Sequence, residues 1–169
     1  MIRRRALRPR LAAATPAPSP AIVEALLARL EAAARARLGR SLGLFHVDAG
    51  SCGGCELELR AAAGAVHDLA RLGLSFVASP RHADVLLLCG PLTRNLREAV
   101  ERTWQAMPEP KWAVALGDCA VDGGVFRGSY AVHDAAAALL PIDLVIRGCP
   151  PTPAQILEGL RALLEANGG

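Results

Sequence analysis

The sequence lacks several features that would identify a common functional class. No apolar run approaches the ~18 residues that a membrane-spanning helix needs, so we expect no crossing of a bilayer. No P-loop, dinucleotide-binding glycine fingerprint or Ser/His/Asp arrangement is present. The four histidines are scattered and form no metal-ligand pair, so each is more simply a surface or packing residue.

An export signal is also lacking. Five arginines crowd the first ten residues, but the apolar segment that a twin-arginine signal requires does not follow them. We expect residues 1–18 to form a basic flexible tail, either solvated or lying on acidic lipid or a partner. Without export we expect a reducing compartment, where metal binding or core packing explains five cysteines better than disulfides do.

The composition is apolar for a chain without a membrane span. Hydrophobic residues make up 52% of it, which fits alanine-rich helices on a sheet and a surface that another subunit covers. The formal net charge of +3 is mild, and we expect no nucleic-acid partner.

Short apolar runs alternate with amphipathic segments along the rest of the chain. Strands are expected at about 42–47, 74–78, 84–88, 112–116 and 142–146, and the continuous apolar runs at 84–88 and 112–116 suit buried parallel strands. Helices are expected at about 19–40, 55–72, 95–107, 131–140 and 152–166. The alternation predicts an N-terminal helix followed by one α/β domain over residues 41–169. That domain is expected to be flavodoxin-like, with a doubly wound, mainly parallel sheet.

Four of the five cysteines lie in the loops that follow predicted strands. Cys52 and Cys55 follow the first strand, Cys119 the fourth and Cys149 the last. Because ligands bind beyond the carboxyl ends of parallel strands, we expect these thiols to share one crevice. Neighbouring glycines let a backbone approach an anion closely and aim N–H groups at it. Four thiolates are the expected ligands of a [4Fe–4S] cluster.

Other interpretations of these residues stay open. Zinc also takes four thiolates, although its structural sites usually draw on paired C-x2-C knuckles, and the thiols could also be inert and buried. Cys89 ends an apolar run, so we expect it to pack in the core outside the ligand set. Glu56 and Glu58 are first-turn glutamates that the helix dipole favours, and Glu58 is a candidate proton relay beside a redox centre.

The motifs resemble those of a known superfamily over about residues 42–166. It contains the small subunits of [NiFe] hydrogenases and the B subunit of respiratory complex I. The B subunit has two adjacent cysteines, whereas this chain has Cys-x-x-Cys, which favours the membrane-bound, formate hydrogenlyase-like (group 4) hydrogenases. The segments that carry the resemblance are Cys52-Gly-Gly-Cys55-Glu-Leu-Glu58, Ser79-Pro-Arg-His-Ala-Asp84, Gly90-Pro-Leu-Thr93, Met107-Pro-Glu-Pro-Lys111, Gly117-Asp-Cys119 and Gly148-Cys-Pro-Pro-Thr-Pro153.

The resemblance implies specific roles for several residues. The proximal [4Fe–4S] cluster would be held by Cys52, Cys55, Cys119 and Cys149. Glu58 matches the carboxylate found three residues after the second cysteine. Arg81 matches an arginine near the large-subunit interface.

The resemblance also implies a place in an oxidoreductase complex. The chain would pass electrons between a ferredoxin-like 2×[4Fe–4S] subunit and a hydrogenase-type large subunit, where the hydrogen chemistry occurs. Integral membrane subunits would hold this cytoplasmic assembly on the inner face of the cell membrane. Two alternatives stay open: a complex I-type B subunit that delivers electrons to quinone, and a zinc-stabilised, non-redox assembly module.

Overall fold

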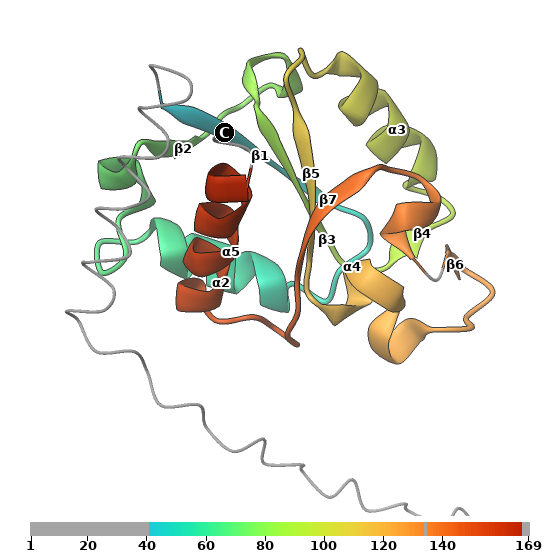
Figure 1. The fold of residues 1–169 in the computed structure, drawn as a ribbon. Helices are drawn as coiled ribbons and strands as arrows, with labels where there is room; N and C mark the ends of the chain where they lie inside the picture. Colours follow the sequence, from blue (N-terminus) through green and yellow to red (C-terminus); the bar gives the residue numbers. More distant parts are fainter. Residues whose placement is uncertain (1–40, 134, 167–169) are drawn as a thin grey trace, which may run out of the picture.

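A five-stranded parallel sheet organises the computed structural model, which describes residues 41–133 and 135–166 (Figure 1). The strands lie in the order β2-β1-β3-β5-β7, which corresponds to the flavodoxin-like order 2-1-3-4-5. The predicted fold class is therefore confirmed. The predicted tail over 1–18 and helix over 19–40 lie outside the described residues. The sheet consists of β1 (Leu42–Asp48), β2 (Leu74–Phe76), β3 (Val85–Cys89), β5 (Trp112–Leu116) and β7 (Ile142–Ile146).

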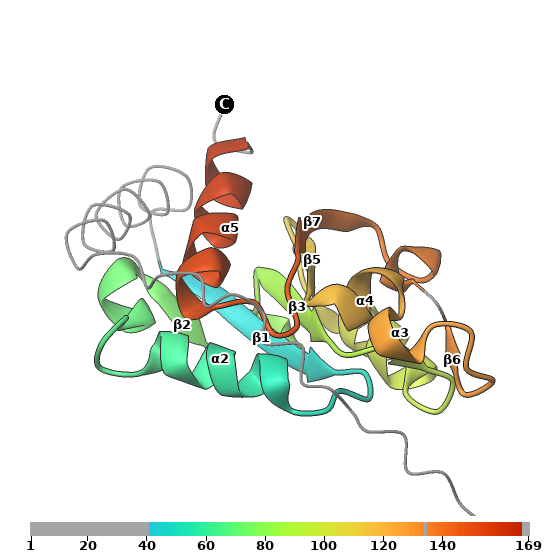
Figure 2. The same cartoon turned by 90° about the horizontal axis from the view of Figure 1, so that it is seen from below.

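Helices cover both faces of this sheet (Figure 2). On one face lie α2 (Gly54–Ala63) and α5 (Pro153–Ala166), and on the other lie α3 (Arg97–Ala106) and α4 (Asp118–Asp122). None of the helices in the described ranges has the length and apolarity to cross a membrane. The remaining elements are the antiparallel pair β4 (Leu92–Thr93) and β6 (Val132–His133) and the short 3-10 turns η1 (Leu69–Leu72), η2 (Pro80–His82), η3 (Gly124–Phe126) and η4 (Ala136–Ala138).

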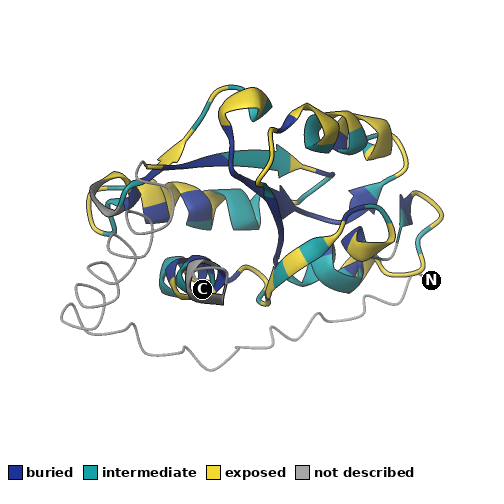
Figure 3. Ribbon diagram, turned by 45° about the horizontal axis from the view of Figure 1, so that its top comes forward, coloured by how far each residue is buried: buried dark blue, intermediate teal, exposed yellow. Residues whose placement is uncertain are grey.

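The neighbouring strands β3 and β5 are buried along their whole length, as continuous apolar runs in a parallel sheet require (Figure 3). Alternate side chains enter opposite cores. Leu87 and Val114 pack toward α2 and α5, whereas Leu86 and Ala113 pack toward α3 and α4. The sheet is thus a rigid platform whose loops can hold side chains in fixed positions.

Two predicted helices differ from the structure. The helix expected over 55–72 stops at Ala63, because Gly64 adopts an extended conformation, and only the turn η1 follows. The helix expected over 131–140 is wrong: residues 132–133 pair with 92–93 as β6, and the alanine run forms only the turn η4. So short a run cannot offset the cost of helix nucleation once its first residues belong to a strand pair.

A capping box fixes the start of α5. The Gln155 side-chain oxygen accepts a hydrogen bond from the Thr152 backbone N–H at 2.8 Å. The Thr152 hydroxyl in turn accepts one from the Gln155 N–H at 3.3 Å. Two backbone donors at the helix N-terminus are thereby satisfied, which fixes where the chain enters α5 after Cys149.

Asp84 is the buried charged side chain of the described chain, with 2% of its surface exposed. One of its carboxylate oxygens accepts a hydrogen bond from the Gly43 N–H at 2.7 Å, and its own N–H donates to the Gly43 carbonyl at 2.8 Å. A Cβ at Gly43 would overlap the His82 carbonyl oxygen. The segment from Ser79 to Asp84 therefore closes the amino-terminal end of β1 against β3.

We expect Asp84→Ala to lower the free energy of unfolding by about 1–3 kcal/mol, because it leaves a buried N–H donor without its acceptor. Denaturant unfolding of the variant measures this loss. Asp143→Ala is the matched control, since the Asp143 carboxylate accepts from the Ala113 N–H at 2.8 Å at a more exposed position. Equal losses in the two variants would contradict the importance given to burial.

Candidate metal centre

Four strands of the sheet end at the same level. Asp48 of β1 pairs with Cys89 of β3, Cys89 pairs with Leu116 of β5, and Leu116 pairs with Ile146 of β7. The loops that leave β1, β5 and β7 from this edge carry the four predicted ligands. The crevice outside the carboxyl ends of a sheet of this kind is where such folds bind ligands.

The loop after β1 is held by its own side chains. The Asp48 carboxylate accepts hydrogen bonds from the N–H groups of Gly50 and Ser51 at 2.8 and 2.5 Å. The Ser51 hydroxyl accepts one from Gly53 at 3.1 Å. Gly53 then begins α2 in the left-handed conformation, with φ at +84°. This winding leaves Cys52 exposed and places Cys55 half-buried in the first turn of α2.

The loops after β5 and β7 are bonded to each other. The Asp118 N–H donates to the Gly148 carbonyl at 2.9 Å, and the Gly148 N–H donates to the Asp118 carboxylate at 3.2 Å. The Arg147 guanidinium lies 3.6 Å from Asp118 and 3.1 Å from the Asp122 carboxylate, and its hydrogen bond lowers the pKa of Asp122. These contacts fix the short helix that carries Cys119 against the loop that carries Cys149.

Glycine backbones approach three of the cysteine sulfurs. A Cβ at Gly117 would lie 2.6 Å from the Cys55 Sγ, and one at Gly124 would lie 2.9 Å from the Cys119 Sγ.

The third approach is looser and joins two loops. A Cβ at Gly54 would lie 3.6 Å from the Cys52 Sγ and 3.8 Å from Pro150, the residue after Cys149. Glycine at these places leaves room beside the sulfurs, and the approach of Gly117 to Cys55 brings the β5 loop onto the β1 loop.

The four thiols also influence one another electrostatically. Burial raises the pKa of Cys119, a hydrogen bond from the backbone of Val125 opposes that rise, and the charges of the other three cysteines add to it. The structure thus brings Cys52, Cys55, Cys119 and Cys149 to one edge of the sheet. Among the described residues, no group of three or more His, Cys, Asp or Glu side chains is arranged to hold a single metal ion. The ligand set therefore stays a prediction.

The donor chemistry fits a thiolate-bound metal group. Thiolates are the soft ligands that zinc and iron–sulfur clusters prefer. The glycine backbones beside the sulfurs supply the space, and the Val125 N–H aimed at the Cys119 sulfur is a donor of the kind that stabilises negative charge.

Cys89 lies in this region too, which the sequence did not indicate. It is fully buried at the end of β3, as expected for a core residue, but its thiol is hydrogen-bonded to Cys55. This bond lowers the pKa of Cys55, and together with burial it raises that of Cys89. The signal available in the sequence was its position: the last residue of a central strand lies at the same edge as the ligands.

Of the two glutamates after Cys55, only Glu56 lies in the first turn of α2. Glu58 is half-buried one turn into the helix. The Glu56 carboxylate lies 3.8 Å from the His46 Nε2 on β1. Burial lowers the pKa of His46, although Glu56 and Asp48 act in the opposite direction.

Arg81 is not brought to the cysteines. It is exposed on η2, which precedes β3 and packs beside the amino-terminal end of β1. The cysteines lie beyond the opposite, carboxyl ends of the strands. The structure therefore separates this arginine from the candidate metal centre by the length of the sheet.

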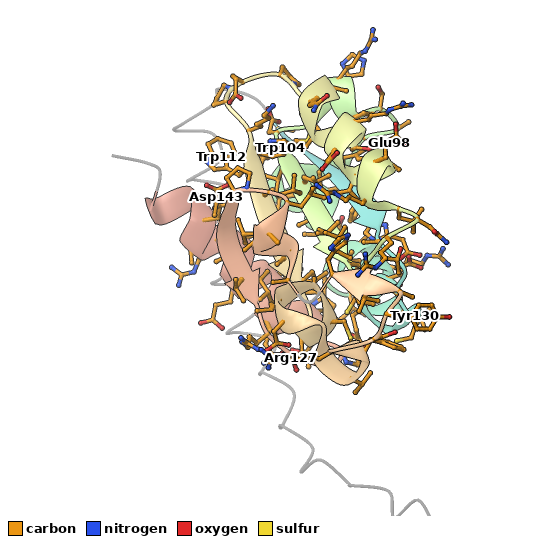
Figure 4. All side chains as sticks on the ribbon, turned by 90° about the vertical axis from the view of Figure 1, so that its right-hand side faces the viewer. Glu98, Trp104, Trp112, Arg127, Tyr130 and Asp143 are labelled. Carbon is orange, nitrogen blue, oxygen red and sulfur yellow. The ribbon has the colours of Figure 1, made fainter. Side chains whose placement is uncertain are left out.

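An exposed apolar loop follows Cys119. Val125, Phe126 and Tyr130 expose 80%, 41% and 90% of their surfaces. Tyr130 and Arg127 lie at the end of the sheet where the cysteines lie, opposite to the end that holds Trp112 and Asp143 (Figure 4). Adjacent exposed apolar side chains of this kind usually mark a binding surface.

Comparison with known sequences identifies related proteins. A family model described as NADH ubiquinone oxidoreductase, 20 Kd subunit, matches residues 52–163. Formate hydrogenlyase subunit 7 of Escherichia coli is 40% identical over 87% of this chain and 58% of its own length. A probable membrane-bound hydrogenase subunit, mbhJ of Pyrococcus furiosus, is 41% identical over 76% of this chain and 77% of its own length. The B subunit of NADH-quinone oxidoreductase from Clostridium beijerinckii is 45% identical over 66% of each protein.

Solved structures agree with the fold. A chain of the membrane-bound sulfane sulfur reductase, an archaeal respiratory membrane complex, matches with a TM-score of 0.68 at 27% identity and covers 87% of this chain and 75% of that one. A chain of an NAD+-reducing [NiFe]-hydrogenase matches with a TM-score of 0.58 at 18% identity over 75% of this chain and 93% of that one, which shows a shared fold. The chain spans about 58% of the formate hydrogenlyase subunit. The relatives are, by their names, subunits of oxidoreductase complexes.

We expect Gly117→Ala to reduce the iron bound per chain after reconstitution with iron and sulfide, because its methyl group would displace the Cys55 sulfur. Gly73→Ala is the matched control: Gly73 also has a positive φ of +71°, but nothing lies within 4 Å of its Cβ position. Both variants carry a left-handed backbone cost of roughly 1–2 kcal/mol. Equal iron contents in the two variants would contradict the role given to Gly117.

Proposed function

The chain belongs to the NADH ubiquinone oxidoreductase 20 Kd subunit family, and on this premise we propose that it is the electron-transfer subunit of a membrane-associated, hydrogenase-type complex. One [4Fe–4S] cluster would be held by Cys52, Cys55, Cys119 and Cys149. When bound, such a cluster supplies one-electron transfer. The hydrogen chemistry would take place on the large subunit of the complex.

The observation that carries this proposal is the convergence of three separate loops. Cys55 on the β1 loop lies against Gly117 of the β5 loop, and Gly117 and Asp118 are bonded to the β7 loop at Ile146 and Gly148. Nothing in the packing of the sheet requires a thiol on each of these loops. Four thiols so distributed make sense as one ligand set, and a cluster of this kind takes four thiolates.

The chain's own residues would act on this centre in three ways. The thiols bind the metal, and the glycine backbones leave room for their sulfurs. The Val125 N–H donates toward the Cys119 sulfur and stabilises negative charge there. Glu58, half-buried one turn beyond Cys55, is the carboxylate we propose as a proton relay toward the partner subunit.

Two features favour a hydrogenase-type complex over a quinone-reducing one. The ligand pair is Cys-x-x-Cys, whereas the complex I B subunit has adjacent cysteines. The match to formate hydrogenlyase subunit 7 also covers 87% of this chain, against 66% for the Clostridium B subunit. A complex I-type role in delivering electrons to quinone is the second candidate, because identity to that B subunit reaches 45%.

The proposed setting follows from the same relatives. We propose a large subunit, a ferredoxin-like 2×[4Fe–4S] subunit and integral membrane subunits as partners, with the chain peripheral on the cytoplasmic face of the membrane. Names such as "membrane-bound hydrogenase subunit" support this setting.

The test of the proposed cofactor is spectroscopic. We expect the dithionite-reduced chain to give a fast-relaxing S = 1/2 EPR signal and to contain iron and sulfide. Cys149→Ser should lower the iron and sulfide content strongly, because one of four thiolate ligands is lost. A colourless protein with about one zinc per chain and no iron would instead establish the zinc-stabilised alternative.

The exposed apolar loop supports a partner surface beside the metal centre. We propose that the large subunit covers Val125, Phe126 and Tyr130, which follow Cys119 and would bring the partner close to the proposed cluster. Covering this loop would also keep water from the end of the sheet where electrons cross.

We expect Tyr130→Asp to reduce co-purification of the large subunit at least several-fold, because a charge would be buried in an apolar contact. Val66→Asp is the matched control, since Val66 is 84% exposed on the loop after α2, away from the cysteines. Both variants should retain the thermal stability of the native chain. Full recovery of the large subunit with Tyr130→Asp would refute this surface.

A further inference from the structure

We propose that Cys89 is a positioning residue for the metal centre: its S–H donates a hydrogen bond to the Cys55 sulfur, holds that ligand in place and favours the reduced state of the bound cluster. This inference rests on the proposed function, because it assigns Cys55 as a ligand. It gives a role to the one cysteine that lies outside the ligand set.

The position of Cys89 is fixed by the sheet. It is the last residue of the central strand β3, with Asp48 paired on one side and Leu116 on the other. Its carbonyl accepts a hydrogen bond from the Ala49 N–H at 2.9 Å, and none of its surface is exposed. Cys89 therefore lies beneath the loops that carry the ligands, on a backbone that cannot follow their movements.

The Cys55 sulfur lies between two constraints. The Cys55 side chain packs against the apolar core cluster to which Cys89 belongs, and it is hydrogen-bonded with the Cys89 thiol. The Gly117 backbone approaches the Cys55 sulfur from the β5 loop. A side chain held on two sides loses little further freedom when it binds a metal. This confinement distinguishes Cys55 from Cys52, which is exposed at the loop surface.

The direction of the hydrogen bond follows from ligation. A metal-bound cysteine carries no proton, so the S–H of Cys89 is the only proton available between the two sulfurs. A donor to a ligand sulfur stabilises the more negative, reduced state of an iron–sulfur cluster and raises its reduction potential. Cys89 itself is fully buried on a strand rather than on a loop, which argues against its serving as a fifth ligand.

The experiment is a redox titration of the full chain, followed by EPR, with three substitutions at one position. Cys89→Ser keeps a donor, whereas Cys89→Ala and Cys89→Val remove it, and the valine keeps the bulk. We expect Cys89→Ala and Cys89→Val each to shift the one-electron reduction equilibrium about threefold or more toward the oxidised cluster. This lowers the midpoint potential by ~28 mV at 59 mV per decade. Cys89→Ser should keep a midpoint potential near the native value. All three should retain the native iron content.

A core control separates hydrogen bonding from packing. Val114→Ala removes apolar volume from the same core cluster but keeps the Cys89 thiol, and should lower thermal stability but leave the potential unchanged. Native potentials in both Cys89→Ala and Cys89→Val would overturn the proposal. Loss of the cluster from all three Cys89 variants would overturn it as well, since Cys89 would then be a ligand.

A second measurement keeps the contact testable if the chain holds no iron. In the variant with serine at positions 52, 119 and 149, only Cys55 and Cys89 remain of the five cysteines. We expect diamide, which accepts the two electrons and two protons of the thiols, to join them as an intramolecular disulfide that mass spectrometry detects as a loss of two hydrogens. Serine at 55, 119 and 149, which leaves Cys52 with Cys89, is the control. Absence of the disulfide in the first variant would overturn the contact. Absence of iron in the native chain would overturn the proposed function and the effect of Cys89 on the cluster, while the disulfide would still establish the contact between the two thiols.

Discussion

The parallel pairing of β1, β3, β5 and β7 at their carboxyl ends is the constraint on which the candidate centre depends. Asp48, Cys89, Leu116 and Ile146 lie in register across the sheet, so three loops distant in sequence leave from one line. The central strands are buried on both faces, which makes a shift of register costly because it would move apolar side chains out of both cores. The positions of the thiols are therefore set by the core rather than by the loops.

Beyond this edge of the sheet, glycine backbone lies beside two of the cysteine sulfurs, where a larger residue would place a side chain. Gly117 and Gly124 lie against the Cys55 and Cys119 sulfurs with positive φ values of +86° and +50°. In this conformation glycine avoids the strain that other residues would carry, and it leaves space next to the sulfurs. Hydrogen bonds between Asp118 and Gly148 then join two of the loops into one unit. Loops from three strands thus meet at one edge of the sheet, where we propose that the four thiols bind a metal group.

The two ends of the sheet have different tasks, although the motifs that mark them are equally distinctive in the sequence. At the amino-terminal end, Asp84 binds the Gly43 N–H and closes the segment that carries Arg81 onto the first strand. At the carboxyl end lie the cysteines and the exposed apolar loop. Packing therefore accounts for Asp84 in the Ser79–Asp84 motif, whereas for the cysteine motifs we propose metal binding.

Much of this was predictable from local patterns. Strands buried on both faces appear as continuous apolar runs, the Thr152–Gln155 capping box is a short-range hydrogen-bond pattern, and the cysteines follow strand ends within a few residues. The tertiary structure decided the contacts between segments that are far apart in the sequence. Residues 132–133 pair with 92–93 instead of starting a helix, Gly117 meets Cys55, and Cys89 bonds to Cys55. No local pattern encodes these contacts, because each depends on which strands are neighbours and on how their ends align. The sequence by itself therefore determined the kind of side chains proposed as ligands and the edge of the sheet where they lie, because both follow from local patterns. The register of the sheet decided which groups contact these side chains.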